Sequence, residues 1–385
     1  MNAFFDFDVV ECRRQKIKAY YNLLKASGRN VYIYGAGEYA ELLKTYLNKK
    51  GISVKGLTLS GQFASKIPGV LPLNDVVSHG HMSLIYGLEN GFSKWFYKKI
   101  EQLQEEIKKY DDVDFFVPSD YWLTELGPKY FSHEFIDEKY LRENFEAFEL
   151  TYGMLSDELS RMVMKEYLYS SLCQDASQLA SLGSDWKYDY DWDLLFKKCD
   201  GDIVIECGAF NGKSIAEACE FTQQKYEMIA LECDSENYKK CCNRVQNLPN
   251  VKVLNYGVWN KKTKLAVVQL DSASFLKEVD DDTDSRNVVE VLNIDSLAHS
   301  KKIAAIIMDI EGSEMNALMG AQNAIRDGAN LAVRVYHRKD DLITIPQYIK
   351  SLNENYKIYM RHERGASLCR TGDETTLYAI CSHSC

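Results

Sequence analysis

The sequence predicts an α/β protein with two doubly wound domains of mainly parallel strands. Two stretches, 30–40 and 202–212, each read as a buried strand, a turn with two glycines and the start of a helix. From residue 202 onward, short apolar runs alternate with helical segments. This alternation is typical of a parallel sheet with helices packed on both of its faces.

Composition limits the class of protein. The 385 residues suffice for two domains, and hydrophobic and charged fractions of 46% and 26% are ordinary for a globular chain. The net charge of −10 argues against a nucleic-acid partner, which needs a basic face. No apolar run has the length of a membrane helix, and no basic signal segment opens the chain. We expect a cytoplasmic protein with reduced cysteines, no membrane span and no nucleic-acid partner, and we leave its oligomeric state open.

Residues 1–120 predict a small Rossmann-like domain. Its first strand leads through the turn Gly35-Ala36-Gly37 into a helix and a second strand, which form a βαβ unit. No acid follows that second strand at 57–60, which disfavours bound NAD. The other elements predicted here are helices over 11–26 and 91–110 and strands over 83–87 and 114–117.

Residues 121–200 predict a helical connector, because helical periodicity returns near 156–171. Aromatic and acidic residues alternate over 186–193. The aromatics either line an acceptor pocket or pack at the seam between the domains, and the sequence favours packing.

Residues 201–385 predict the second domain. Its last two strands, 357–361 and 376–380, are close in sequence and predict an antiparallel hairpin at the sheet edge. The segment 264–294, with an acidic turn at 280–284, predicts an inserted hairpin rather than a crossover helix. The parallel strands are predicted to end near Glu206, Glu232, Leu254 and Asp309 and just before His337.

The first two of these strands end in residues suited to a nucleoside with a charged tail. Ligands of open α/β sheets bind at the carboxyl ends of the strands, where a helix start also supplies free N–H groups. We expect the tail to be held by Glu206, Gly208, Ala209 and Gly212. Glu232 is placed to accept the ribose hydroxyls. Because Phe210 replaces the second glycine of the dinucleotide motif, the spacing favours S-adenosylmethionine.

Adenine contacts are expected from the turns after the second and third strands. Cys233 and Asp234 follow Glu232 directly and could flank the base. Gly257 would let the backbone pass near the adenine, with Val258 or Trp259 packing on it; Trp259 could equally pack in the core.

Three carboxylates follow the fourth strand within six residues, Asp309, Glu311 and Glu314. Such a group repels itself unless it binds a cation, a sulfonium or hydroxyl donors. We expect Asp309 to face both the donor methionine and the acceptor, and we expect Asp309 and Glu311 to be catalytic; a divalent ion held by them is possible but not favoured. Glu314 begins a helix and is interpreted as a partner of the helix dipole. His337 is either a general base or a hydrogen-bonded structural histidine.

Together these residues resemble the FkbM family of S-adenosylmethionine-dependent methyltransferases. The resemblance covers roughly 155–380. It implies a class I methyltransferase sheet with Rossmann-like topology and O-methylation of a hydroxyl, often on a sugar or natural product. The N-terminal domain is similar to small domains of sugar-modifying enzymes in surface polysaccharide pathways. The motifs that carry the resemblance lie at 204–212, 230–234, 256–260, 293–297, 308–314 and 335–337.

The chain departs from the family pattern at two positions. Ile307 stands where many members carry a lysine, and Cys233 where a proline is common. The first departure puts acceptor chemistry in doubt, because no lysine can act there.

We expect a transferase with a small-molecule or glycan acceptor. The alternatives are a non-catalytic module that binds a nucleotide sugar, and a nicotinamide-dependent oxidoreductase that uses Gly35 and Gly37.

Overall fold

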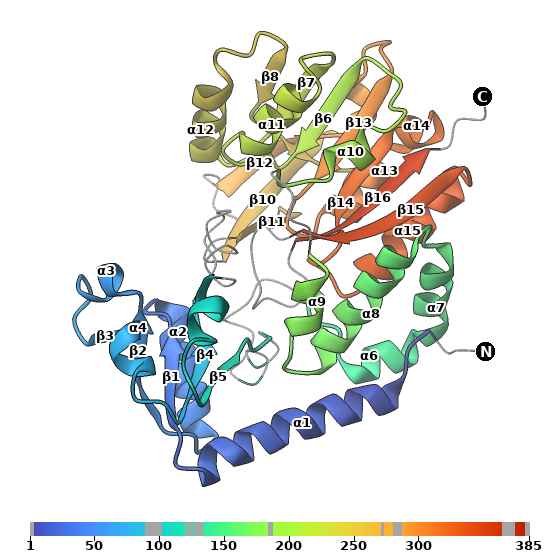
Figure 1. Cartoon of the computed structure of the whole chain (residues 1–385). Coiled ribbons are helices and arrows are strands. Elements are labelled where there is room, and N and C mark those ends of the chain that lie inside the picture. The colour runs from blue at the N-terminus through green and yellow to red at the C-terminus, as the bar shows by residue number, and fades with distance from the viewer. Residues whose placement is uncertain are drawn as a thin grey trace.

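Two sheet-containing parts and a group of helices make up the computed structural model (Figure 1). The structure describes residues 4–88, 102–119, 122, 125, 134–183, 188–270, 273–279, 287–363 and 374–381. The predicted α/β class with two Rossmann-like sheets is confirmed. Among the described residues, no helix is both long and apolar enough to cross a bilayer.

The N-terminal sheet has five parallel strands in the order β3-β2-β1-β4-β5. Gly35 begins the turn after β1, and a Cβ built there would lie 2.2 Å from the carbonyl oxygen of Gly87, so only glycine fits. The three-residue strand β3 was not predicted. A helix was expected at 91–110. Its residues 91–101 lie outside the described residues, and 102–107 are helical. The elements are β1 (Asn30–Tyr34), α2 (Glu38–Lys49), β2 (Val54–Leu59), α3 (Gly61–Ala64), β3 (Val70–Pro72), α4 (Leu73–Val77), β4 (Met82–Tyr86) and β5 (Val113–Phe116).

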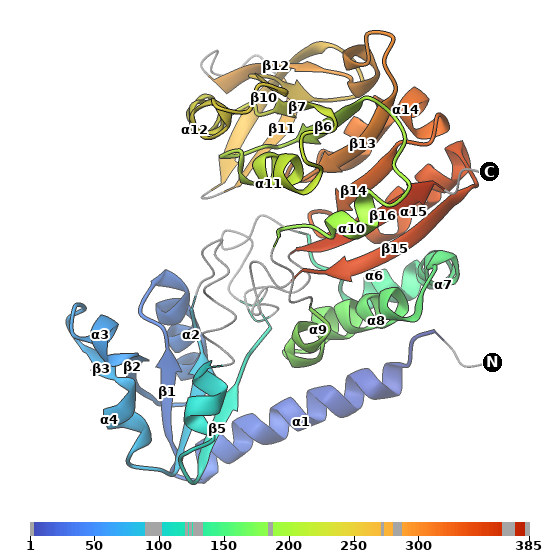
Figure 2. The same cartoon turned by 45° about the horizontal axis from the view of Figure 1, so that its top comes forward.

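Helix α1 (Phe7–Ala26) joins this sheet to the group of helices, as both views show (Figures 1 and 2). It begins earlier than predicted because Asp6 caps it by accepting from the N–H of Asp8. Near its start, Arg13 donates two hydrogen bonds of 2.7 and 2.9 Å to Glu166 of helix α8. Near its end, Leu24 is buried in the core of the N-terminal sheet.

The group of helices packs against the edge strand β15 (Tyr356–His362). The backbone N–H of Ser156 donates to the carbonyl of Ile358 at 2.8 Å, and Arg361 forms an ion pair of 2.6 Å with Asp157. Apolar side chains of these helices belong to the same core as one face of the second sheet. The helices are α6 (Glu138–Glu143), α7 (Phe145–Met154), α8 (Glu158–Leu172) and α9 (Ser177–Ser181). Helix α10 (Trp192–Leu195) belongs instead to the core on the other face of the second sheet.

Asp157→Asn is expected to destabilise the protein by about 1–2 kcal/mol at pH 7, because it removes the charge that binds Arg361, while Asn can still cap α8. Burial would raise the pKa of Asp157, but hydrogen bonds from Arg361 and Ser160 outweigh it and lower the pKa to about 2. The lowered pKa stabilises the fold above the ordinary carboxyl range, and this contribution is lost as the pH falls toward 2. The free energy of unfolding, measured with urea at several pH values, should therefore differ most between wild type and variant at neutral pH. This difference should become smaller as the pH falls.

The control for this prediction is Glu158→Gln, which removes the exposed ion pair with Arg161 on the same helix. This variant should lose less than about 1 kcal/mol. Equal losses in the two variants would contradict the role given to Asp157.

The C-terminal sheet has seven strands in the order β15-β16-β14-β13-β6-β7-β8. All pair in parallel except β16, which is antiparallel to β14 and to β15, so the predicted edge hairpin is confirmed. Strand order reverses between β6 and β13, where open α/β sheets bind ligands. The strands are β6 (Ile203–Cys207), β7 (Glu227–Leu231), β8 (Val251–Leu254), β13 (Ile303–Met308), β14 (Asn330–Arg334), β15 and β16 (Thr375–Cys381). The helices between them are α11 (Lys213–Phe221), α12 (Ser235–Val245), α13 (Glu314–Met319), α14 (Gln322–Arg326) and α15 (Asp341–Leu352).

The inserted segment forms a separate four-stranded sheet in the order β11-β10-β12-β9. The predicted insertion of β-strands instead of a crossover helix is confirmed, but the hairpin is formed by β10 and β11, and β12 pairs antiparallel with β10 and parallel with β9. A hairpin with its turn at 280–284 would pair β11 with β12, which are not neighbours in this sheet. The acidic turn predicted at 280–284 lies outside the described residues. The elements are β9 (Gly257–Val258), β10 (Thr263–Leu270), β11 (Ala273–Glu278), β12 (Val288–Leu292) and the short helix η4 (Ile294–Leu297).

Candidate active site

Backbone hydrogen bonds hold the first turn of the C-terminal domain against its two neighbours. The N–H groups of Gly208 and Ala209 donate to the carbonyl of Leu231 at 2.9 and 3.0 Å, and that of Asp309 donates to Cys207 at 3.1 Å. The turns after β6, β7 and β13 therefore meet at one edge of the sheet.

Glu206 is the buried acid of the first turn, with 2% of its surface exposed. One carboxyl oxygen interacts with the Ser214 hydroxyl, and the other has no hydrogen-bond partner among the described residues. Burial raises the pKa of Glu206 to about 8, so it is mostly neutral at pH 7. A buried oxygen without a partner is costly, and a bound donor group would satisfy it.

At two positions of this turn, neighbouring atoms of the protein leave room only for glycine. Gly208 has φ +84°, and a Cβ there would lie 1.9 Å from the carbonyl oxygen of Asp309. Gly212 has φ +76°, and its Cβ would lie 2.9 Å from the sulfur of Cys241. The Ala209 side chain is buried in the core, so only its backbone can face a ligand. A cofactor role for these three residues stays a prediction.

Glu232 organises the turn predicted to bind the nucleoside. Its two carboxyl oxygens accept the N–H groups of Phe210 and Asp234, each at 2.8 Å. Burial raises the pKa of Glu232, although these two hydrogen bonds oppose the shift. Each oxygen keeps a second lone pair, so the ribose role predicted for Glu232 remains compatible with these bonds.

Three of the residues predicted around the adenine have structural roles. Asp234 caps α12 by accepting from the N–H groups of Glu236 and Asn237. Val258 is buried in the core, and a Cβ on Gly257 would lie 2.9 Å from Val291.

The side chain that joins these turns was not predicted. Asn255 donates to the carbonyls of Glu232 and Cys233 at 2.8 and 3.2 Å. It thereby fixes the end of β8 to the end of β7. The adenine roles of Cys233, Asp234, Gly257 and Val258 remain predictions.

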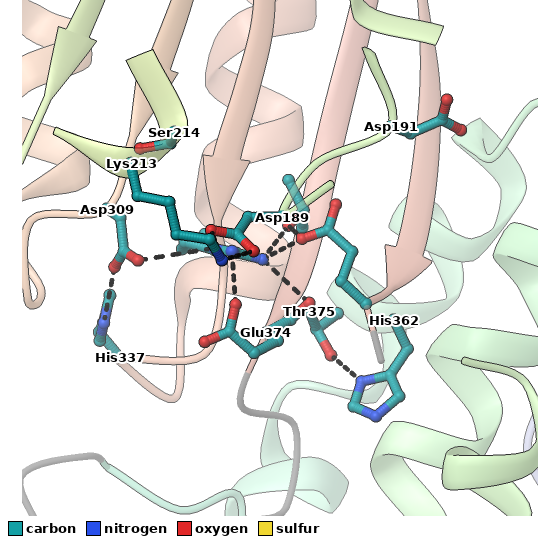
Figure 3. A network of polar contacts seen from close by, with 12 residues as sticks. Asp189, Asp191, Lys213, Ser214, Asp309, His337, His362, Glu374 and Thr375 are labelled. Carbon is teal, nitrogen blue, oxygen red and sulfur yellow. Dashed lines mark hydrogen bonds and ion pairs between the residues drawn. The ribbon is translucent and has the colours of Figure 1, made fainter. Parts of the chain in front are cut away.

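The predicted catalytic residues come together around His337, which lies 3% exposed after β14. Its Nε2 lies 3.5 Å from Asp309 and 3.6 Å from Glu311, and Figure 3 shows the contact with Asp309. Its Nδ1 lies 2.8 Å from Glu314, which also accepts the N–H of Ile310. Glu314 is therefore an ion-pair partner of His337 as well as the first residue of α13.

The surrounding carboxylates set the protonation state of His337. Burial would lower the pKa of His337, but Glu314, Glu311 and Asp309 outweigh it and raise the pKa to about 10. The same pairing lowers the pKa of Glu314 despite its burial. The imidazole is therefore charged at neutral pH and cannot accept a proton. This state argues against the predicted role of general base.

Arg334, at the end of β14, was missed by sequence reasoning. Only 3% of its side chain is exposed, and it contacts Glu363, Glu374 and, at 3.6 Å, Asp309. Its guanidinium lies 4.4 Å from the ring centre of Tyr190. An arginine inside the apolar run Leu-Ala-Val-Arg-Val-Tyr was the available signal, because buried charges need partners.

The aromatic and acidic stretch before β6 also reaches this site. Asp189 forms bonds of 2.5 and 2.7 Å to the ammonium of Lys213, the first residue of α11 (Figure 3). Tyr190 and Trp192 are buried in an apolar core, as the packing interpretation expects, while Tyr190 also stacks beside Arg334. Trp186 lies outside the described residues.

Comparisons with known proteins agree with this geometry. Residues 206–358 match the profile of the family described as "Methyltransferase FkbM domain". The structure of methyltransferase FkbM from Methylobacillus flagellatus KT is similar, with a TM-score of 0.63, 17% identity and coverage of 97% of this chain and 98% of that one. An rRNA methylase from Streptococcus thermophilus aligns with a TM-score of 0.31 and 14% identity over 50% of this chain and 94% of its own. A comparison with curated proteins gave no match.

Proposed function

Because residues 206–358 form an FkbM methyltransferase domain, we propose that the chain transfers a methyl group from S-adenosylmethionine to a hydroxyl of its acceptor. A sugar hydroxyl, in a glycan pathway, is the acceptor class that we propose. The single observation that carries the donor assignment is Glu206, a buried carboxyl whose second oxygen has no hydrogen-bond partner among the described residues. It lies at the strand reversal, beside a turn that Glu232 holds in place.

The residues at this edge fit the donor. Glu206 and the N–H groups of the turn would hold the methionine moiety, and Glu232 the ribose. The turns with Cys233, Asp234, Gly257 and Val258 would border the adenine. The donor supplies an activated methyl group on a sulfonium. The protein must chiefly align the acceptor oxygen with that group, which contributes several kcal/mol.

Asp309 is the residue we assign to the acceptor proton. Its side chain is 32% exposed, whereas His337 is buried behind it with Nδ1 taken by Glu314. Arg334 and His337, on two sides of Asp309, hold its carboxylate in place. We assign His337 to holding the Asp309 carboxylate in position, and Glu311 to balancing the charge of His337. Ile307 is fully buried in β13 and takes no part in the site.

Isothermal titration with S-adenosylmethionine tests the donor assignment. Saturable binding tighter than millimolar is expected, and its absence would end the proposal. A parallel fluorescence titration with NADH tests the oxidoreductase alternative. We then propose a screen with methyl-labelled donor against sugars with free hydroxyls, amines and RNA. Labelling of RNA or of amines alone would overturn the proposed acceptor class.

Asp309→Asn should lower kcat about a hundredfold or more, because an amide cannot accept the hydroxyl proton. The Kd for the donor should change little, since Asp309 is assigned to the acceptor. Once the screen has found an acceptor, steady-state kinetics and titration of the same variant measure both quantities. Glu236→Gln, at an exposed carboxylate on α12, is the control. Full turnover by the Asp309 variant would contradict the role.

A further inference from the structure

We infer that Glu314 is a positioning residue, which holds Asp309 in place through the imidazole of His337 and through the backbone of the turn after β13. This role rests on the proposed function, because Asp309 is the carboxylate assigned there to the acceptor proton. It goes beyond the place of Glu314 at the start of α13, where a carboxylate is a partner of the helix dipole.

Glu314 is buried more completely than a partner of a helix dipole needs to be. Its side chain is 0% exposed, and α13 has only six residues. A carboxylate complements a helix dipole from the surface, whereas a buried one costs free energy unless charged or hydrogen-bonding partners compensate. The burial of Glu314 therefore indicates a partner inside the protein.

One oxygen of Glu314 joins the two elements that carry the site. Oε1 accepts from the N–H of Ile310 at 3.0 Å and lies 2.8 Å from Nδ1 of His337. Ile310 directly follows Asp309, so the first contact fixes the backbone beside that residue. The second contact fixes the imidazole ring, because the partner of one ring nitrogen determines how the other nitrogen is presented.

The imidazole passes this support on to Asp309. Nε2 of His337 lies 3.5 Å from Oδ1 of Asp309 (Figure 3). With Nδ1–H directed at Glu314, the charged ring presents its second N–H to the Asp309 carboxylate. A neutral ring that kept its proton on Nδ1 would instead turn a lone pair toward Asp309. The charge of His337 therefore decides whether this contact attracts or repels.

Glu314 is the main source of that charge. Burial opposes protonation of His337, and Glu314 makes the largest contribution that raises its pKa, ahead of Glu311 and Asp309. The effect is mutual, since His337 lowers the pKa of Glu314 against the effect of burial. The two side chains therefore form an ion pair at neutral pH.

Two further titratable groups face Glu314 from other elements, and both are neutral at pH 7. Burial raises the pKa of Asp341, the first residue of α15, well above its usual range. Burial also raises the pKa of the Cys207 thiol at the end of β6. Neither group can replace the negative charge of Glu314.

The burial of the three central residues fits these roles. The side chain of Asp309 is 32% exposed, whereas those of His337 and Glu314 are 3% and 0% exposed. Of the three, only Asp309 can therefore meet an acceptor, and Glu314 acts on it through its neighbours. Because a misplaced reacting group can cost about a hundredfold in rate, loss of this support should lower kcat.

Glu314→Gln in the full chain tests the role, because the amide oxygen can still accept from Ile310 and His337 and only the charge is removed. The first readout is a pH titration of the His337 imidazole, followed by nuclear magnetic resonance without any ligand. The wild-type ring has a pKa of about 10, and the pKa in the variant should be lower by about one pH unit or more. Circular dichroism checks that the variant is folded.

Kinetics with the acceptor found by the screen give the second readout. The kcat of Glu314→Gln should fall about tenfold to a hundredfold, while the Kd for the donor stays at the wild-type value. The decline of kcat at high pH should begin at a lower pH than in the wild type, since the imidazole loses its proton earlier. Glu314→Asp keeps the charge and should recover part of the lost kcat. Asp157→Asn, which breaks an ion pair in the group of helices, should keep the wild-type kcat.

His337→Gln distinguishes positioning from a general loss of stability. If Glu314 acts through His337, the double variant should have nearly the kcat of His337→Gln alone. Losses that multiply, an unchanged titration of the imidazole, or full turnover by Glu314→Gln would overturn the role of Glu314. A wild-type protein that binds no S-adenosylmethionine would instead remove the proposed function, and the titration would still decide the pairing of Glu314 with His337.

Discussion

Arg334→Met should destabilise the protein by about 3–5 kcal/mol, the cost of leaving buried carboxylates without their partner. The guanidinium contacts Glu363 and Glu374, and the side chains of both glutamates are largely buried. Burial raises the pKa of Glu363 to about 7, although Arg334 opposes the shift. Without the arginine its pKa should rise further. The free energy of unfolding in urea, measured at pH 6 and pH 8, is the readout.

The sign of the pH effect follows from that raised pKa. A carboxyl with a raised folded-state pKa stabilises the fold most in acid, and its contribution falls as the pH rises through the folded value. The loss caused by Arg334→Met should thus be larger at pH 8 than at pH 6. Arg338→Met, which removes an exposed pair with Glu134, should cost less than about 1 kcal/mol. Equal losses of unfolding free energy in these two variants would contradict the stabilising role given to Arg334.

Glu232→Ala should weaken S-adenosylmethionine binding about a hundredfold, measured as the Kd from isothermal titration. The change removes the acceptor of two backbone N–H groups, those of Phe210 and Asp234. These two bonds exist with and without the donor, so they hold the turn but do not enter the Kd directly. The Kd rises because the predicted ribose contact is lost: hydrogen bonds to a charged group are each worth about 1.5–3 kcal/mol, and about 2.8 kcal/mol corresponds to a hundredfold in Kd.

A matched control lies four residues further along the chain, on helix α12. Glu236 is exposed and pairs with Lys239, so Glu236→Gln should bind the donor nearly as wild type does. Near wild-type donor binding by Glu232→Ala, or an equal loss in both variants, would remove Glu232 from the donor site.

The C-terminal sheet could be predicted because its central strands are buried on both faces. Such strands read as continuous apolar runs, and β13 (Ile-Ala-Ala-Ile-Ile-Met) is buried along its whole length. Each ends at a polar residue or glycine, so positions such as Asp309 could be placed at the ligand edge. The edge hairpin was predictable for a different reason, since a short separation between strands excludes a crossover.

The pairings inside the site could not be predicted in the same way. His337 and Glu314 are 23 residues apart, and Arg334 and Glu374 are 40 apart, so their contacts arise only when the sheet assembles. Glu314 was therefore interpreted from its local position, as a helix-dipole partner. Gly208 was correctly expected to need a glycine, but the carbonyl that demands it belongs to Asp309.

The most direct measurement is a crystal structure of the protein soaked with S-adenosylhomocysteine. The account predicts the ligand at the reversal between β6 and β13, with its amino acid end near Glu206 and its ribose near Glu232. An empty edge at saturating ligand, or side chains of the protein filling that space, would contradict it.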